Sequence, residues 1–231
     1  MLHRFAAALP ARTFARALLG PALLALCAAA PSPASIAPAT SPSEVYVAME
    51  TAAGTITLAL DAQHAPLTTA NFLKYVDGKR FDGTTFYRSM HLDWGEPPNG
   101  LIQGGTQNDP GRIFKPVAHE ATSDTGILHK RGTISMARFA PGTATGDFSI
   151  MLSDQPGLDA QPQAQDPEAR PGFAAFGRVV AGMSVVDAIW AMPRSQTKGV
   201  GVMKGQMLEP PVRIVTVRRV PAPSVAAAAA D

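Results

Sequence analysis

The stretch FYRSMHLDWGEPPNGLIQGG, residues 86–105, carries the two polar side chains around which this chain is organised. It begins with Phe86-Tyr87-Arg88 and ends with Leu101-Ile102-Gln103-Gly104-Gly105. Both ends have the aromatic and branched residues of short strands, and the Gly and Pro residues between them indicate breaks. The pattern predicts two strands that present Arg88 and Gln103 to one shallow groove.

Short strands are more frequent than helices in the rest of the chain. One helix is predicted where Pro66 takes the first helical position, which tolerates its missing N–H, and Gly78 supplies a stop. The other predicted helix covers residues 182–191. Strands are predicted at residues 45–51, 55–60, 133–138, 148–152, 173–180 and 212–220. Many strands with only two helices favour a mostly β fold, an antiparallel barrel or sandwich, over repeated βαβ units.

The N-terminal 30 residues have the pattern of an export signal. Arg4, Arg12 and Arg16 precede an apolar run, LLGPALLALCAAA at residues 18–30, which is too short to span a membrane. The alternative is a buried helix, but the Pro- and Ala-rich linker at residues 31–44 has no core-forming pattern. We expect a signal peptide over residues 1–30 and one domain over residues 45–220, which is about 175 residues and enough for a sizeable core.

The single cysteine, Cys27, lies in the leader, so the sequence predicts neither disulfides nor a thiolate metal site in the domain. Export without a cysteine pair suits a bacterial periplasm. A lipid anchor at Cys27 is an alternative, although lipoprotein boxes have a small residue where this chain has Leu26. The Pro- and Ala-rich tail at residues 221–231 is predicted to be disordered.

Charge and histidine spacing exclude other classes of function. The formal net charge is +2 and its positive residues are scattered, so no nucleic-acid partner is expected. His64, His91, His119 and His129 have no metal-ligand spacing, and we expect no metal or cofactor. A monomer is the default expectation.

Motifs along the chain resemble those of the cyclophilins, over residues 45–220. PLTTANFLKYV at residues 66–76 is similar to the family's first helix, and GTISMA at residues 132–137 to one of its strands. The remaining matches, in the family's order, are Phe86-Tyr87-Arg88, Gln103-Gly104-Gly105, Phe148 and Phe176-Gly177. The resemblance implies a closed eight-stranded antiparallel barrel capped by two helices. It also implies peptidyl-prolyl cis–trans isomerase activity, which would assist the folding of exported proteins by acting on proline-containing polypeptides.

The resemblance assigns Arg88 as the catalytic arginine and Gln103 as the residue that orients the substrate. A twisted X–Pro bond restores a lone pair on the proline nitrogen, and an arginine can donate to it only in that state. No covalent intermediate is implied. The residues implied to bind substrate are Phe86, Tyr87, Leu101, Met136, Ala137, Arg138, Asp147, Phe148, Ser149 and Phe173.

The chain departs from the family in its proline pocket. Gly100 and Ser149 stand where the family has phenylalanine, so two aromatic walls are lost, and Phe173 stands at a histidine position. Phe173, or Trp94 in the longer connection, is a candidate replacement.

Asp147 stands at a glutamine position, where it could either pair with and orient Arg88 or neutralise it. These departures motivate an alternative function, a binding module or chaperone on the same fold that holds proline segments with little turnover.

Overall fold

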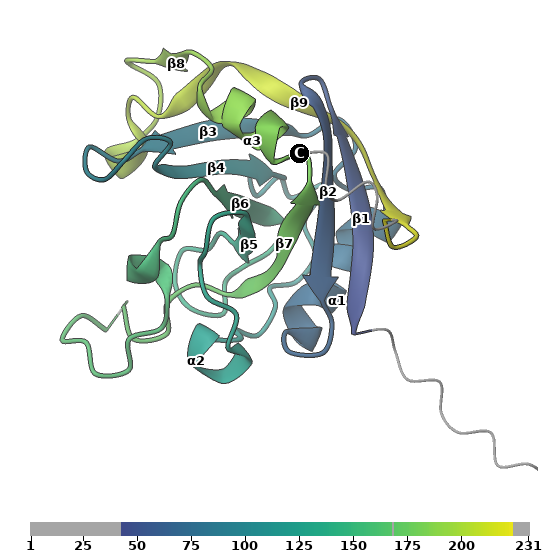
Figure 1. Cartoon of the computed structure of the whole chain (residues 1–231), viewed down its shortest axis with the longest axis vertical. Helices are drawn as coiled ribbons and strands as arrows, with labels where there is room; N and C mark the ends of the chain where they lie inside the picture. The colour runs from purple at the N-terminus through teal and green to yellow at the C-terminus, as the bar shows by residue number, and fades with distance from the viewer. Residues whose placement is uncertain (1–42, 168, 224–231) are drawn as a thin grey trace, which may run out of the picture. The chain divides into compact units, whose positions relative to one another are not determined.

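The structure is a computed structural model that describes residues 43–167 and 169–223 (Figure 1). The predicted signal peptide, Cys27, and most of the predicted linker and tail lie outside the described residues.

In the described part of the chain, nine strands form one antiparallel sheet, and eight of them close into a barrel. The order around the barrel is β1-β2-β7-β5-β6-β4-β3-β9, and β9 pairs with β1 to complete the circle. This confirms the predicted eight-stranded barrel. The strands are β1 (Glu44–Thr51), β2 (Gly54–Asp61), β3 (Thr85–His91), β4 (Gly100–Gly105), β5 (Thr133–Met136), β6 (Asp147–Met151), β7 (Ala175–Ala181), β8 (Arg194–Ser195) and β9 (Met207–Val220).

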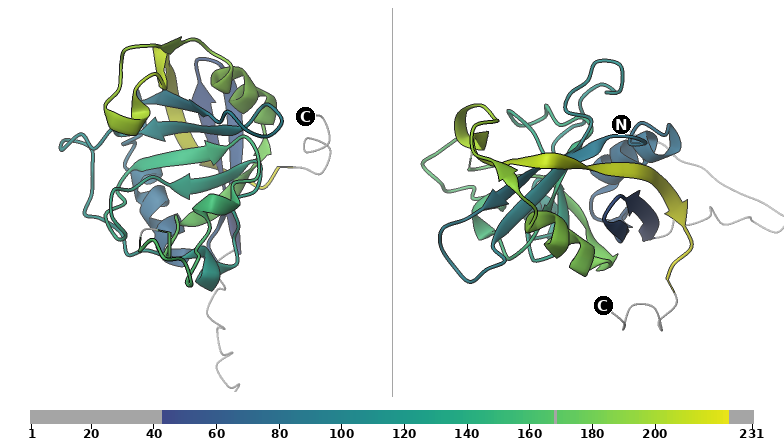
Figure 2. Two further views of the ribbon diagram at one scale, coloured as in Figure 1. Left: turned by 90° about the vertical axis from the view of Figure 1, so that its left-hand side faces the viewer. Right: turned by 90° about the horizontal axis from the view of Figure 1, so that it is seen from above.

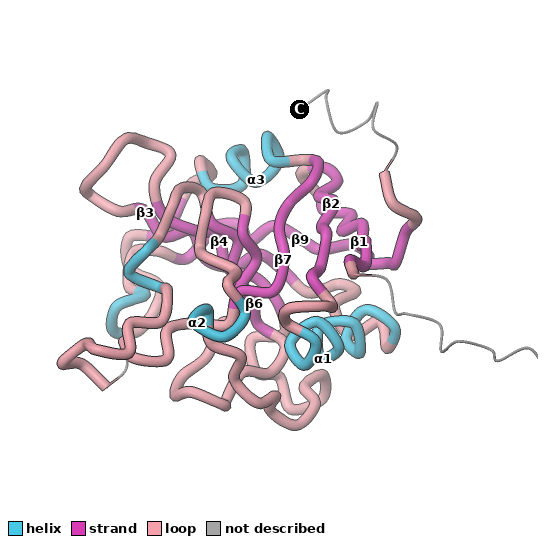
Figure 3. Tube along the Cα trace, turned by 60° about the horizontal axis from the view of Figure 1, so that its bottom comes forward, coloured by secondary structure: helices cyan, strands magenta, loops and turns pink. Residues whose placement is uncertain are grey.

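Two helices lie at opposite ends of the barrel, α1 (Pro66–Asp77) and α3 (Met183–Trp190), as Figures 1 and 3 show. α1 has the predicted limits, with Pro66 in its first turn, but no side chain caps it from its own N-cap position. Instead the Glu120 carboxylate accepts hydrogen bonds from the backbone N–H groups of Leu67 (3.1 Å) and Thr68 (2.7 Å). A further one-turn helix, α2 (Thr122–Thr125), follows Glu120 in a segment predicted to be loop.

An aromatic cluster fills the barrel at the level of α1. The Phe148 ring lies 5.5 Å from the ring of Phe72 and 5.7 Å from that of Phe86, in edge-to-face contacts. Phe81 and Phe176 complete the cluster. Buried aromatic pairs of this geometry stabilise a fold by about 0.5–1.5 kcal/mol beyond their burial. The cluster therefore anchors β3 and β6, two of the strands that carry the site on their outer face.

β9 begins at Met207, five residues before its predicted start at Val212. Pro210 and Pro211 hide this part from a sequence pattern, because proline cannot donate to a sheet ladder. The ladder is interrupted there: Phe86 pairs with Val212, and the next pair is Arg88 with Met207. Figure 2 shows how β9, in yellow, bends between its pairings. The early start places the segment before Met207 beside Arg88.

Candidate active site

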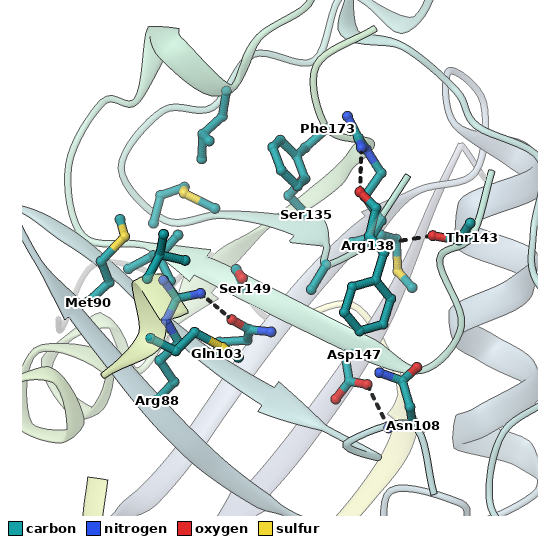
Figure 4. A pocket seen from close by; sticks show the side chains of 18 residues that line it. Arg88, Met90, Gln103, Asn108, Ser135, Arg138, Thr143, Asp147, Ser149 and Phe173 are labelled. Atoms are coloured by element: carbon teal, nitrogen blue, oxygen red, sulfur yellow. Dashed lines mark hydrogen bonds between the residues drawn. The ribbon is translucent and has the colours of Figure 1, made fainter. Parts of the chain in front are cut away.

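A cavity of about 370 Å³ lies on the outer face of β3, β4, β5 and β6 (Figure 4). Successive strand residues face opposite sides of a sheet. In β6, Asp147, Ser149 and Met151 line the cavity, whereas Phe148 and Ile150 face the core.

Arg88 reaches the cavity because β3 contains a bulge. Residues two apart normally share a face, and Phe86 is fully buried in the core. The register shifts between Phe86 and Arg88: Phe86 pairs with Gly104 and Arg88 with Gln103, so Tyr87 is the extra residue. A bulge of this kind re-aims a side chain, and here it turns Arg88 outward.

The Arg88 guanidinium is held by two neutral amide oxygens. Its Nη1 donates to Oε1 of Gln103 and its Nε donates to Oε1 of Gln206, each at 2.8 Å. Among the described residues, its Nη2 has no hydrogen-bond partner. Burial lowers the pKa of Arg88 below its ordinary value, but a guanidinium stays charged in proteins. The arrangement presents a charged donor, free at Nη2, to the cavity.

Gln103 belongs to a chain of hydrogen bonds that fixes its amide. Its Oε1 accepts from Arg88, and its Nε2 donates to the Tyr87 hydroxyl at 2.7 Å. The Tyr87 hydroxyl in turn donates to Oδ1 of Asp147 at 3.3 Å. Burial raises the pKa of Tyr87 far above its ordinary value, so the phenol stays protonated and can donate.

Asp147 holds a turn at the edge of the cavity. Its Oδ1 accepts from the backbone N–H of Gln107 at 2.8 Å, and its Oδ2 from that of Asn108 at 3.1 Å. Burial raises the pKa of this carboxyl, and the two N–H groups oppose the rise. Within residues 43–167 and 169–223, no ion pair joins Asp147 to Arg88; the two are linked only through Gln103 and Tyr87.

Flexible apolar side chains form much of the cavity wall. Phe173 is among them, and its ring packs against Arg138, whose guanidinium carbon lies 4.5 Å from the ring centroid. Trp94 is 60% exposed and does not line the cavity, so of the two candidate replacements only Phe173 is in place. The other apolar lining residues are Met90, Leu101, Met136, Ala137, Phe139, Met151, Leu158, Val202 and Met203.

Most of the predicted site residues meet at this cavity. Those that line it are Arg88, Leu101, Gln103, Met136, Ala137, Arg138, Asp147, Ser149 and Phe173. Phe86, Tyr87 and Phe148 do not: both phenylalanines belong to the aromatic core, and Tyr87 lies behind Gln103. The observed strands are shorter than predicted at this edge of the cavity. Ala137 and Arg138 follow the end of β5, and Phe173 precedes the start of β7.

Sequence reasoning missed several lining residues. Met90 and Met151 follow Arg88 and Ser149 at the two-residue strand spacing, which could have identified them. Val202 and Met203 come from the connection before β9, where no periodic pattern exists. Gln206 comes from the same connection and bonds Arg88 without lining the cavity.

In the part of the chain that the structure describes, no group of three or more His, Asp, Glu or Cys side chains could hold a metal ion. No helix in that part of the chain is long and apolar enough to cross a membrane.

Comparison with known proteins adds independent information. Residues 46–219 match the family model described as cyclophilin type peptidyl-prolyl cis-trans isomerase/CLD. A peptidyl-prolyl cis-trans isomerase A from Dickeya dadantii is 37% identical over 163 residues, covering 69% of this chain and 76% of the relative. A peptidyl-prolyl cis-trans isomerase from Acinetobacter baylyi is 35% identical over 180 residues, covering 76% and 86%.

Solved structures share the fold. A cyclophilin type peptidyl-prolyl cis-trans isomerase from Cryptosporidium parvum superposes with a TM-score of 0.58 at 19% identity, covering 78% of this chain and 99% of the other. A structure of the same isomerase, determined in the presence of the dipeptide Ala-Pro, gives a TM-score of 0.56 at 18% identity, covering 77% and 99%.

Proposed function

The chain belongs to the cyclophilin-type peptidyl-prolyl cis–trans isomerase family and has that family's activity, and we propose that Arg88 drives it as a transition-state donor. The barrier to rotation about an X–Pro bond is about 18–20 kcal/mol, because the C–N bond has partial double-bond character. Twisting the bond restores a lone pair on the proline nitrogen. A guanidinium N–H that donates to this nitrogen stabilises the twisted state and neither planar form. A preorganised donor of this kind contributes about 3–4 kcal/mol, or 10²–10³ in rate.

The proposal rests on the partners of Arg88. Both groups that accept hydrogen bonds from it are neutral amides, and the Asp147 carboxylate accepts from the backbone N–H of Gln107 instead. A carboxylate bonded to Arg88 would compete with the proline nitrogen for its charge. With Gln103 and Gln206 as acceptors, the positive charge stays available to a substrate. The apolar wall beside Arg88 is suited to the proline ring.

We propose that the substrates are proline-containing segments of exported, unfolded or flexible polypeptides. A similar structure was determined with the dipeptide Ala-Pro, and a cavity of about 370 Å³ is in the size range of ligand pockets. The basic and apolar pattern of residues 1–30 supports export to the periplasm. The protein is proposed to act there as a monomer, freed from its signal; a lipid anchor at Cys27 is the alternative.

The experiment is exchange NMR of a short Ala-Pro peptide with the mature domain, the Arg88→Ala variant and an Arg178→Ala control. Arg178 lies on β7, is exposed and pairs with Glu44, away from the cavity. The native domain and the control should accelerate exchange equally, and Arg88→Ala should lose about a hundredfold. If none of the three accelerates exchange while all bind the peptide, the domain is a proline-segment binder, the alternative that Gly100 and Ser149 motivate.

Localisation is tested separately. When the full chain is expressed, release by osmotic shock of a product shortened at its N-terminus would support a periplasmic isomerase. Retention in the membrane fraction that a Cys27→Ala variant abolishes would support the lipid anchor instead.

A further inference from the structure

The connection between β8 and β9, residues 196–206, forms part of the active-site wall. Val202 and Met203 line the cavity. The segment is folded back on itself, because the N–H of Gly205 donates to the carbonyl of Lys198 at 3.0 Å and that of Gln206 to the carbonyl of Met203 at 3.1 Å. An ion pair between Lys198 and Glu209 ties the segment to β9.

Gln206 ends this segment and is fixed at three points. Its Nε2 donates to the carbonyl of Val202 at 2.8 Å, and its backbone carbonyl accepts from the N–H of Ser89 at 2.9 Å. Because its amide nitrogen is engaged by a carbonyl, the amide oxygen must face the other way, toward Nε of Arg88 at 2.8 Å. The orientation of this acceptor is therefore set before any substrate arrives.

The geometry points to Gln206 as a positioning residue for Arg88, an inference that rests on the proposed role of Arg88. Gln103 alone holds the guanidinium at Nη1 and leaves it able to turn about that contact. A second acceptor at Nε fixes the plane of the guanidinium, and with it the direction of the Nη2 donors. A displacement of about 1 Å at a reacting group can cost about 10²-fold in rate, so the second contact has a large effect without touching the substrate.

A purely structural role makes a different prediction. If Gln206 only shaped the loop, its loss would alter the wall at Val202 and Met203 and weaken peptide binding, whether or not Arg88 were present. If it acts through Arg88, its loss lowers turnover, leaves peptide affinity unchanged, and has no further effect once Arg88 is gone.

The test uses Gln206→Met, which keeps the length of the side chain and removes the acceptor, in the native and Arg88→Ala backgrounds. Gln196→Met is the matched control, because Gln196 is exposed on the same connection and makes no side-chain hydrogen bond among the described residues. Exchange NMR gives turnover, peptide titration gives the Kd, and the side-chain Nε–H signal of Arg88 reports its order directly.

We expect Gln206→Met to lower turnover about 5–20-fold, with an unchanged Kd and a less ordered Arg88 Nε–H. The control should match the native domain, and the double variant should match Arg88→Ala. Native turnover in Gln206→Met, an equal loss in the Arg88→Ala background, or an unchanged Arg88 signal would each overturn the inference. If the native domain itself fails to accelerate exchange, the proposed function fails, and the Arg88 signal alone then decides whether Gln206 orients it.

Discussion

Replacing Gly100 by alanine should destabilise the domain strongly. Gly100 opens β4 opposite His91, in a backbone conformation with φ +131° that L side chains rarely adopt. A Cβ atom there would lie 2.0 Å from the carbonyl oxygen of Met90 and 2.9 Å from its carbonyl carbon. Both contacts are with the backbone of β3, so no side-chain rotation can relieve them.

The cost has two parts. Holding alanine in a disfavoured backbone conformation costs about 1–3 kcal/mol. Moving Gly100 away from β3 weakens hydrogen bonds on both sides of β4: that from the Leu92 N–H to the Asn99 carbonyl beside β3, and that from the Leu152 N–H to the Gly100 carbonyl beside β6. Each contributes about 0.5–1.5 kcal/mol. The total is about 2–6 kcal/mol, and at about 2–4 °C per kcal/mol for a domain of this size the Tm should fall by roughly 4–24 °C.

Thermal and urea unfolding of Gly100→Ala beside Gly142→Ala measures this cost. Gly142 also has a positive φ, +77°, but a Cβ there would meet nothing within 4 Å. The control therefore carries backbone strain without the clash, and should lose only about 1–2 kcal/mol. If Gly100→Ala is no less stable than Gly142→Ala, the close approach of the two strands is not as described. If the expected loss is found, the phenylalanine that the resemblance assigns to this position cannot be accommodated here.

Two further predictions concern stability. Glu120→Ala should lower the free energy of unfolding by about 1–2 kcal/mol, because it removes the acceptor for two N–H groups at the start of α1; urea unfolding that shows no change would refute this role for Glu120. Burial lowers the pKa of His129 below its ordinary value of 6.5. Below about pH 6.5 the imidazole therefore takes up a proton in the unfolded chain more readily than in the folded one. The stabilisation associated with neutral His129 is present above that pH and is lost as the pH falls. The free energy of unfolding should fall more steeply between pH 7.5 and 5.5 in the native domain than in a His129→Gln variant, and equal slopes would show that another group is responsible. Asp147, whose pKa burial raises, acts in the opposite sense in both proteins, so the comparison isolates His129.

The strands and helices that repeat a regular pattern could be predicted from the sequence. α1 has its predicted limits because Pro66 and Gly78 mark them locally. The start of β9 could not be found, since its two prolines argue against a strand in any local window. α2 is a single turn without a periodic pattern, and therefore gave no signal.

The parts of the site that were predicted lie on strands or directly beside them. Arg88 and Gln103 lie on adjacent strands of one predicted pair, and the structure joins them by a hydrogen bond. The bulge at Tyr87 leaves no trace in the sequence, because the register depends on the partner strand. Gln206 lies 118 residues from Arg88, and only the closed barrel brings the two together.

If Arg88 acts as proposed, the walls of the proline pocket and Arg88 affect different parts of the reaction. The resemblance implies an aromatic wall where this chain has Ser149, and adaptable methionines line the cavity instead. Such a difference is expected to alter how well the proline ring is held, in the planar and twisted forms of the substrate alike. Such uniform binding changes KM and leaves the barrier nearly untouched. In the proposed mechanism the Arg88 donor acts only on the twisted form. Gln103 and Gln206, which hold the Arg88 guanidinium by hydrogen bonds, are not part of the altered walls. The departures in the pocket are therefore expected to change which sequences are bound around the proline, while the chemistry at Arg88 is kept.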